Sequence, residues 1–133
     1  MKSAKIIVEV VADSPESAVA AQDGGADRLE VCVNPAKGGL FPSAKLIREI
    51  RERVAIPIHV MIRPRPGNFV YSDSEFELMK DQILIARESG ADGVVFGILD
   101  KKRDVDGRTR ALVELSTPFP SPFIAHLTKH ASR

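Results

Sequence analysis

The chain has 133 residues, 44% of them hydrophobic and 28% charged, and its formal net charge at pH 7 is +1. This length suits one globular domain, and the near-neutral charge excludes a strong bulk attraction to nucleic acids or membrane surfaces. No apolar run approaches the roughly 20 residues of a membrane span, and residues 1–5 lack a secretory signal pattern. The single cysteine, Cys32, excludes an internal disulfide, so we expect a reducing, cytoplasmic location.

Strand and helix signals alternate four times along the chain. Short apolar runs predict strands at residues 5–11, 28–33, 58–63 and 93–99. The predicted helices begin at caps, which are Asp13 or Ser14, Ser43, and Ser72 or Asp73, and a fourth helix is expected at about residues 108–115. Loops rich in Gly and Pro follow the second and third strands, at residues 34–42 and 64–71.

A turn of the same composition ends the first and the third predicted helix. Gly25-Ala26-Asp27 and Gly90-Ala91-Asp92 each separate a helical stretch from an apolar run. Glycine fits the left-handed conformation that ends many helices, and the apolar run is typical of a buried parallel strand. The repeat therefore predicts a parallel sheet wound with right-handed crossovers.

Two α/β architectures fit this order, a (β/α)8 barrel and a doubly wound sheet. No Gly-x-Gly-x-x-Gly follows the first strand, which disfavours a dinucleotide-binding sheet. Polar residues alternate with apolar ones inside the strands. In the third strand Ile58, Val60 and Ile62 share one face, and the polar set shares the other. This alternation favours the barrel, with the apolar set under the helices and the polar set in the interior.

The inward-facing set carries the candidate chemistry, and it consists of Glu9, Glu30, Cys32, His59, Met61 and Arg63, with Arg65 just beyond. Glu9 and Glu30 on neighbouring strands repel unless a cation lies between them, and Arg63 is the expected cation. One interpretation is an acid–base and anion site, in which Glu9 or Glu30 is the catalytic base and Arg63 holds a phosphate or carboxylate. The other is a buried ion network that stabilises strand register.

The two long loops add candidates for binding a small anionic ligand. Gly38 and Gly39 lead to Ser43 at a predicted helix N-terminus, where backbone amides favour anions. Arg63 and Arg65 place two guanidinium groups on a stiff Pro-containing loop. Ordinary Gly/Pro turns explain the same residues equally well.

Three inward residues also have the chemistry of a metal site. Cys32, His59 and Met61 are soft or borderline ligands that suit Cu(I). A methionine on a strand and a buried lone cysteine are, however, more often packing residues.

Several of these segments together resemble the CutC family, which is named for copper homeostasis. The resemblance spans about residues 5–120 and is carried by residues 9–10, 24–32, 38–43, 60–65, 69–72 and 90–97, of which the Met-Ile-Arg-Pro-Arg run at 61–65 is the most specific. It implies a (β/α)8 TIM barrel, a cytoplasmic homo-oligomer and a link to copper. The first strand departs from the family's Glu-Val-Cys by reading Glu9-Val10-Val11, which removes one soft ligand.

Family members are about twice this length, so four β-α units correspond to the N-terminal half of a barrel. We expect a partial barrel domain at residues 1–117 and an irregular tail, unlike the family, at residues 118–133. Three functions remain open. The chain is a copper-handling protein, a barrel enzyme for a small phosphorylated or carboxylated metabolite, or a remnant without independent activity.

The tail suggests a one-base frameshift in a longer gene. Family members continue with a strand reading roughly Val-Thr-Phe-His-Arg-Ala-Phe-Asp-Glu. Dropping the first base from plausible codons for that strand gives Ser-Pro-Phe-Ile-Ala-His-Leu-Thr, which is the sequence of residues 121–128. We expect the nucleotide sequence beyond the codon for Pro120 to encode the remaining strands in another frame. A locus without such a downstream frame would contradict this origin.

Overall fold

The computed structural model describes residues 6–117, and residues 1–5 and 118–133 lie outside this description. The strands are β1 (Glu9–Ala12), β2 (Arg28–Val31), β3 (Ile58–Met61) and β4 (Gly93–Val95). The α-helices are α1 (Pro15–Asp23), α2 (Ala44–Arg53), α3 (Asp73–Glu88) and α4 (Thr109–Ser116), with a short 3₁₀ helix, η1, at Pro35–Lys37. The expected alternation of four strands and four helices is therefore confirmed. None of the helices described is long and apolar enough to cross a membrane.

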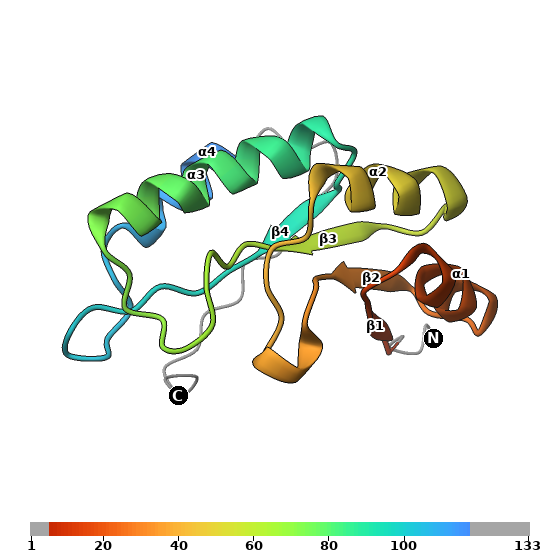
Figure 1. Ribbon diagram of the computed structural model, residues 1–133, viewed down its shortest axis with the longest axis horizontal. Coiled ribbons are helices and arrows are strands. Elements are labelled where there is room, and N and C mark those ends of the chain that lie inside the picture. Colours follow the sequence, from red (N-terminus) through yellow and green to blue (C-terminus); the bar gives the residue numbers. More distant parts are fainter. Residues whose placement is uncertain (1–5, 118–133) are drawn as a thin grey trace, which may run out of the picture.

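The four strands form one parallel sheet in the order β1-β2-β3-β4. Helices α1, α2 and α3 follow one another along one side of this sheet, where α1 contacts β1 and β2, and α3 contacts β4 (Figure 1). In this sheet each strand lies beside the next strand of the chain, and the connecting helices lie on one side. This arrangement is that of a β/α barrel rather than of a doubly wound sheet. The N-terminal half of a TIM barrel is thus the architecture observed.

The apolar side of the sheet forms the core under the helices. Leu29 and Val31 of β2 and Ile58 and Val60 of β3 have no exposed surface, and the helices cover them with residues such as Ile47, Ile50, Met79, Ile83 and Leu112. The opposite side carries Glu9, Glu30 and Met61, which are only partly buried. The expected division into an apolar face under the helices and a polar inner face is confirmed.

Serine caps begin the first three α-helices. Ser14 and Ser72 each take part in a capping box, and the Ser43 hydroxyl accepts a hydrogen bond from the amide of Leu46. Each cap satisfies backbone donors that have no partner inside the helix. Ser14 and Ser72, rather than the neighbouring aspartates, are therefore the caps.

The repeated Gly-Ala-Asp turn ties the end of a helix to the neighbouring strand. Gly25 and Gly90 have φ angles of 99° and 105°, which glycine adopts without strain. The amide of Asp92 donates to the carbonyl of Ile58 at 2.8 Å, and the Asp92 carboxylate accepts from the amide of Ile58 at 2.8 Å. Asp27 makes the same pair of bonds with Val8, both at 2.8 Å. Each turn thus fixes the start of one strand against the start of the next.

The strands are shorter than the sequence suggests. Pairing in β3 ends at Met61 and in β4 at Val95, although the apolar pattern runs on to residues 63 and 99. The residues after the strands leave the ladder to enter the long loops, while one bond, from the amide of Ile62 to the carbonyl of Val95, still joins them. A hydrophobic pattern in the sequence indicates which residues are buried, and the residues beyond the last paired position of each strand are still buried. The pattern therefore overestimates the strand lengths. The predicted tail at residues 118–133 lies outside the described residues.

Asp92 is expected to stabilise the sheet more than an ordinary surface carboxylate. Its side chain also binds Arg51 at 2.7 Å, so the substitution Asp92→Ala leaves the Ile58 amide and the Arg51 guanidinium without this acceptor. We expect the free energy of unfolding in urea to fall by about 2 kcal/mol. Asp81→Ala, at an exposed position of α3, is the matched control and should change it by less than about 0.5 kcal/mol. Equal losses in the two variants would contradict this role.

Candidate functional site

The inner face of the sheet gathers most of the residues selected from the sequence. Strand register sets Glu9 beside Arg28 and Glu30 beside His59, and the next inward positions are Cys32 and Met61. A cavity of about 250 Å³ opens on this face, and it is lined by Glu9, Glu30, Met61, Phe69, Val95, Phe96 and Gly97. Two candidate carboxylates and one candidate thioether therefore border a single cavity.

The cation beside Glu9 is Arg28 rather than Arg63. The Arg28 Nε donates to Glu9 Oε2 at 2.8 Å, and each side chain is about one quarter exposed. His59 Nδ1 lies 4.0 Å from the same carboxylate oxygen. Arg28 could have been found from the alternation alone, because it shares a face with Glu30 two residues along the strand. The prediction that Arg63 separates the glutamates is wrong for Glu9, because Arg63 lies in the loops beyond the strand.

Arg63 joins the two long loops. Its Nη1 donates to the carbonyls of Lys37 and Gly39 at 3.0 and 3.2 Å, and its Nη2 donates to the carbonyl of Gly67 at 2.7 Å. Its guanidinium carbon also lies 4.7 Å from the centre of the Phe69 ring. Only 6% of the residue is exposed. Backbone carbonyls and an aromatic face thus compensate a buried charge, as such a charge requires.

Gly38 makes room for this arginine. A Cβ at Gly38 would lie 2.5 Å from Arg63 Nη1, and the residue has a φ of 87°. The close approach of the loop and the left-handed backbone both require glycine here. Gly38 therefore has a structural role that its place in a Gly-rich loop did not reveal.

Arg65 is occupied by its own loop and by α3. Its Nε donates to Glu75 Oε2 at 2.6 Å, and its Nη groups donate to the carbonyls of Asn68 and Val70, each at 2.7 Å. Hydrogen bonds from Arg65 hold the pKa of the Glu75 carboxyl below its usual range. The anion site expected at the two long loops remains a prediction. It comprises Arg63, Arg65, Gly38, Gly39 and Ser43, whose described hydrogen bonds and contacts are to other groups of the protein.

Cys32 and Met61 meet at Gly39. A Cβ at Gly39 would lie 3.1 Å from Cys32 Sγ and 3.7 Å from Met61 Cε. Cys32 is 3% exposed, and Gly39 takes a φ of 86°. Glycine at this position leaves room beside Cys32 Sγ and the Met61 methyl group, so the cysteine and methionine side chains border the same small space.

The Cys32 thiol is strongly protonated. Burial, together with the negative charges of Glu30 and Asp13, raises its pKa to about 11. Thiols of this kind are poor nucleophiles near neutral pH. The same negative charges favour a cation that replaces the proton.

His59 lies two residues before Met61 on the same face of β3. Its Nδ1 is 4.0 Å from Glu9 Oε2. Within residues 6–117, no group of three or more His, Cys, Asp and Glu side chains is arranged to hold a metal ion. The structure therefore brings two of the three predicted soft ligands together, and His59 faces a carboxylate instead.

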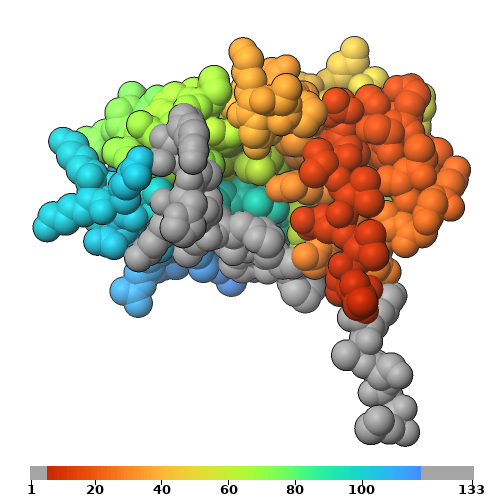
Figure 2. Space-filling model, turned by 90° about the horizontal axis from the view of Figure 1, so that it is seen from below, coloured from red at the N-terminus to blue at the C-terminus, as the bar shows by residue number. Residues whose placement is uncertain are grey.

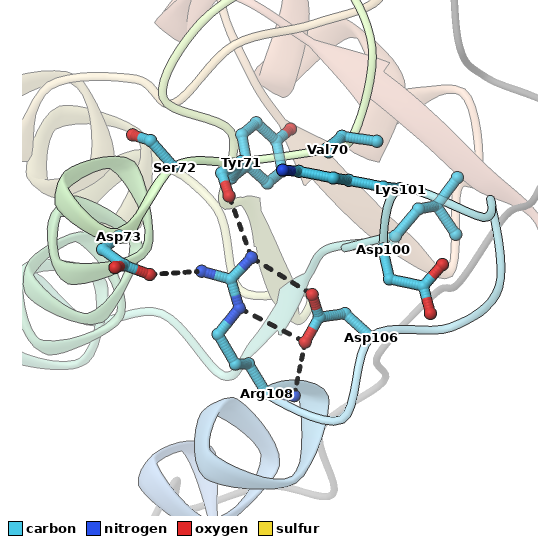
Figure 3. Close-up of a pocket in the computed structure, with 9 residues that line it drawn as sticks. Val70, Tyr71, Ser72, Asp73, Asp100, Lys101, Asp106 and Arg108 are labelled. Carbon is cyan, nitrogen blue, oxygen red and sulfur yellow. Dashed lines mark hydrogen bonds and ion pairs between the residues drawn. The ribbon is translucent and has the colours of Figure 1, made fainter.

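A second cavity, of about 350 Å³, lies where the loop before α3 meets the loop after β4. Arg108 crosses its wall, donating to the Tyr71 carbonyl at 2.9 Å and to Asp106 at 3.1 Å, with Asp73 at 3.5 Å (Figure 3). Burial opposes charge on Asp106, but hydrogen bonds from Arg108 outweigh it and hold the pKa of that carboxyl below its usual range. The sequence showed no signal for this cluster, because Tyr71 and Asp73 lie far along the chain from Asp106 and Arg108. The hydrogen bonds and ion pairs of Arg108 join the two loops.

Comparison with known proteins identifies the family. The CutC family matches residues 6–127 of the chain. The chain belongs to the CutC family. A copper homeostasis protein cutC homolog from Homo sapiens is 45% identical over 118 residues, which are 88% of this chain and 43% of that protein. A family protein CutC from Erwinia tasmaniensis is 49% identical over 110 residues, which are 82% of this chain and 44% of that protein.

A solved structure supports the barrel topology. The crystal structure of a copper homeostasis protein CutC from Streptococcus agalactiae superposes with a TM-score of 0.77 at 35% identity, covering 92% of this chain and 59% of that one. A phosphoenolpyruvate phosphomutase from Streptomyces platensis shares the fold alone, with a TM-score of 0.60 at 13% identity over 93% of this chain and half of that one. The chain spans less than half the length of the two curated relatives.

The protonated state of Cys32 is open to direct titration. We expect the thiolate absorbance at 240 nm of the folded protein to rise with a midpoint near pH 11, and alkylation by iodoacetamide at pH 8 to be about a hundredfold slower than for an ordinary thiol. Glu30→Gln removes one of the causes, so it should lower the midpoint. The protein unfolded in urea is the control, with an ordinary thiol pKa. A folded-state midpoint at the unfolded value would contradict the assignment.

Proposed function

We propose that this CutC chain takes part in copper homeostasis in the cytoplasm by binding Cu(I) between Cys32 and Met61. The observation that supports this is the convergence of the two side chains on Gly39, where a single Cβ position lies within 4 Å of both. Copper is the cargo in this proposal rather than a resident cofactor. The choice of copper rests on the names of the curated relatives, and the choice of ligands rests on the local chemistry of Cys32 and Met61.

The donor set fits Cu(I) better than a hard cation. A thiolate and a thioether are soft ligands, which select Cu(I) over metals that prefer oxygen. Burial of Cys32 keeps bulk water from the thiol, and the Glu30 charge near the thiol favours a bound cation. Cys32 must release its proton on binding, because the thiolate is the ligand.

The enzyme hypothesis has less support. The candidate guanidinium groups of Arg63 and Arg65 are engaged by backbone carbonyls and by Glu75. The phosphomutase likeness lies at 13% identity and shows only the fold. Copper binding by the sulfur pair is therefore the function that the geometry favours.

Competitive Cu(I) titration under anaerobic conditions tests this site. With a chromogenic Cu(I) chelator as competitor, we expect one equivalent of copper per chain, and at least a tenfold weaker Kd in Cys32→Ser and in Met61→Leu. Met79→Leu is the matched control, since Met79 is fully buried in the helix-side core, and it should bind as the wild type does. Unchanged binding in both Cys32→Ser and Met61→Leu would overturn the proposal.

The same titration has an expected pH dependence. Because one proton leaves Cys32 for each ion bound, the Kd should fall about tenfold for each pH unit gained below the thiol pKa of about 11. The substitution Gly39→Ala should also weaken Cu(I) binding, since the added Cβ enters the space around Cys32 Sγ. Gly25→Ala is the control, with a similar positive φ and open space around its Cβ. A pH-independent Kd would rule out the thiolate as ligand.

A further inference from the structure

The loop between β2 and α2 covers the Cys32 thiol. Residues 34–38 of this loop are exposed, but Gly39 is buried against Cys32, of which only 3% is exposed. A Cβ at Gly39 would lie 3.1 Å from the sulfur, which shows how closely the backbone approaches it. In Figure 2 the outer side of the loop (light orange) projects from the surface. Residues 34–39, the covering segment, thus separate the thiol from solvent on this side.

Few hydrogen bonds hold the covering segment to the remainder of the chain. Its own backbone bonds are local, and the reciprocal pair between Val33 and Leu40, at 3.0 and 2.8 Å, closes its neck. Among residues 6–117, the hydrogen bonds described from the segment to residues beyond this neck are the two that Arg63 donates. A compact loop with a closed neck and few outward bonds opens by itself, without unfolding of the sheet beneath it.

The covering segment has turning points at both ends. Asn34 has a φ of 50°, and Gly38 and Gly39 have φ angles of 87° and 86°. Glycine changes its backbone conformation at little cost, and asparagine is one of the few other residues that adopt this left-handed region. The short 3₁₀ helix Pro35–Lys37 lies between these points. Hinges are a few loop residues of this kind on either side of a stiffer unit.

Arg63 fastens the covering segment to the next loop. Its Nη1 donates to the carbonyls of Lys37 and Gly39, and its Nη2 donates to the carbonyl of Gly67. Hydrogen bonds from a charged donor are stronger than those between neutral groups. When the segment swings out, Arg63 loses two of these three acceptors, and its buried charge is less well compensated. The arginine therefore determines how often the segment opens.

We propose that residues 34–39 are a lid latched by Arg63, and that the lid must open before Cys32 exchanges its proton for Cu(I). The copper step rests on the proposed Cu(I) site, whereas the opening of the lid does not. A closed lid shields the thiol, and its opening rate limits how fast the ion enters and leaves. The lid and its latch lie between Cys32 and Gly67, on the two middle strands and their loops, so they do not depend on what pairs with β1 or β4.

Alkylation of the copper-free protein by iodoacetamide at pH 8 tests the latch. Gly38→Ala places a Cβ 2.5 Å from Arg63 Nη1, and Arg63→Lys removes the planar fork, so each should react at least about tenfold faster than the wild type. Gly25→Ala is the matched control, since it also replaces a glycine of positive φ but has open space around its Cβ, and its rate should stay within about twofold. Each rate is divided by the thiolate fraction found by titrating the same variant at 240 nm, so that a changed pKa does not count as opening.

The urea dependence of wild-type alkylation needs no substitution, so it also serves if a variant does not fold. Because lid opening exposes little surface, the rate should be almost independent of urea at low concentrations and rise steeply only near global unfolding. A steep rise from the lowest urea concentrations would overturn the lid. So would unchanged rates in both Gly38→Ala and Arg63→Lys, or an equal acceleration in Gly25→Ala.

The transfer of bound Cu(I) to a chelator separates the lid from the copper proposal. We expect Gly38→Ala to release Cu(I) at least about tenfold faster than the wild type, because the open lid precedes release. Faster alkylation in a protein that binds no Cu(I) supports the lid and contradicts the copper site. Cu(I) that binds to Gly38→Ala and leaves it at the wild-type rate contradicts the lid and leaves the copper site standing.

Discussion

The Asp92 carboxylate joins three segments that the rest of the fold depends on. It accepts the first amide of β3, binds the Arg51 guanidinium of α2, and stands at the turn that starts β4. Arg51 in turn donates to the carbonyls of Val54 and Ile56, so the connection from α2 to β3 is held by the same group. A charged acceptor shared by a strand start and a helix fixes the stagger of neighbouring strands. The inward side chains of β3 and β4 then take their positions from that stagger.

The loops at the other end of the strands are organised by Arg63. A buried guanidinium is costly unless it is hydrogen-bonded or paired with an opposite charge. Here three backbone carbonyls and the Phe69 ring surround it, and Tyr71 lies close enough for the charge to offset part of the rise in its pKa that burial causes. The arginine therefore brings the Gly38–Gly39 segment over the sheet. That placement is what makes Gly39 the meeting point of Cys32 and Met61.

The two glutamates on the inner face of the sheet have different roles. Glu9 is neutralised within the chain by Arg28, whereas Glu30 acts on Cys32 and raises its pKa. One carboxylate is thus structural, and the other tunes the only thiol. This division places the chemistry of the face around Cys32, near the ends of the strands from which the long loops leave, where β/α barrels carry their sites.

The order of elements, the two Gly-Ala-Asp turns and the division of the strands into two faces could all be predicted from the sequence, which also limited the caps of the first and third helices to a serine or its neighbouring aspartate. These features depend on local propensity and on a period of two, which are both readable along the chain. The partners of the charged side chains, in contrast, became known from the three-dimensional structure. Arg28 rather than Arg63 neutralises Glu9, and Arg63 donates to carbonyls of loops up to 26 residues away. Two of the three soft ligands meet while His59 turns to Glu9, because contacts across a sheet depend on stagger and loop path, which no local pattern encodes.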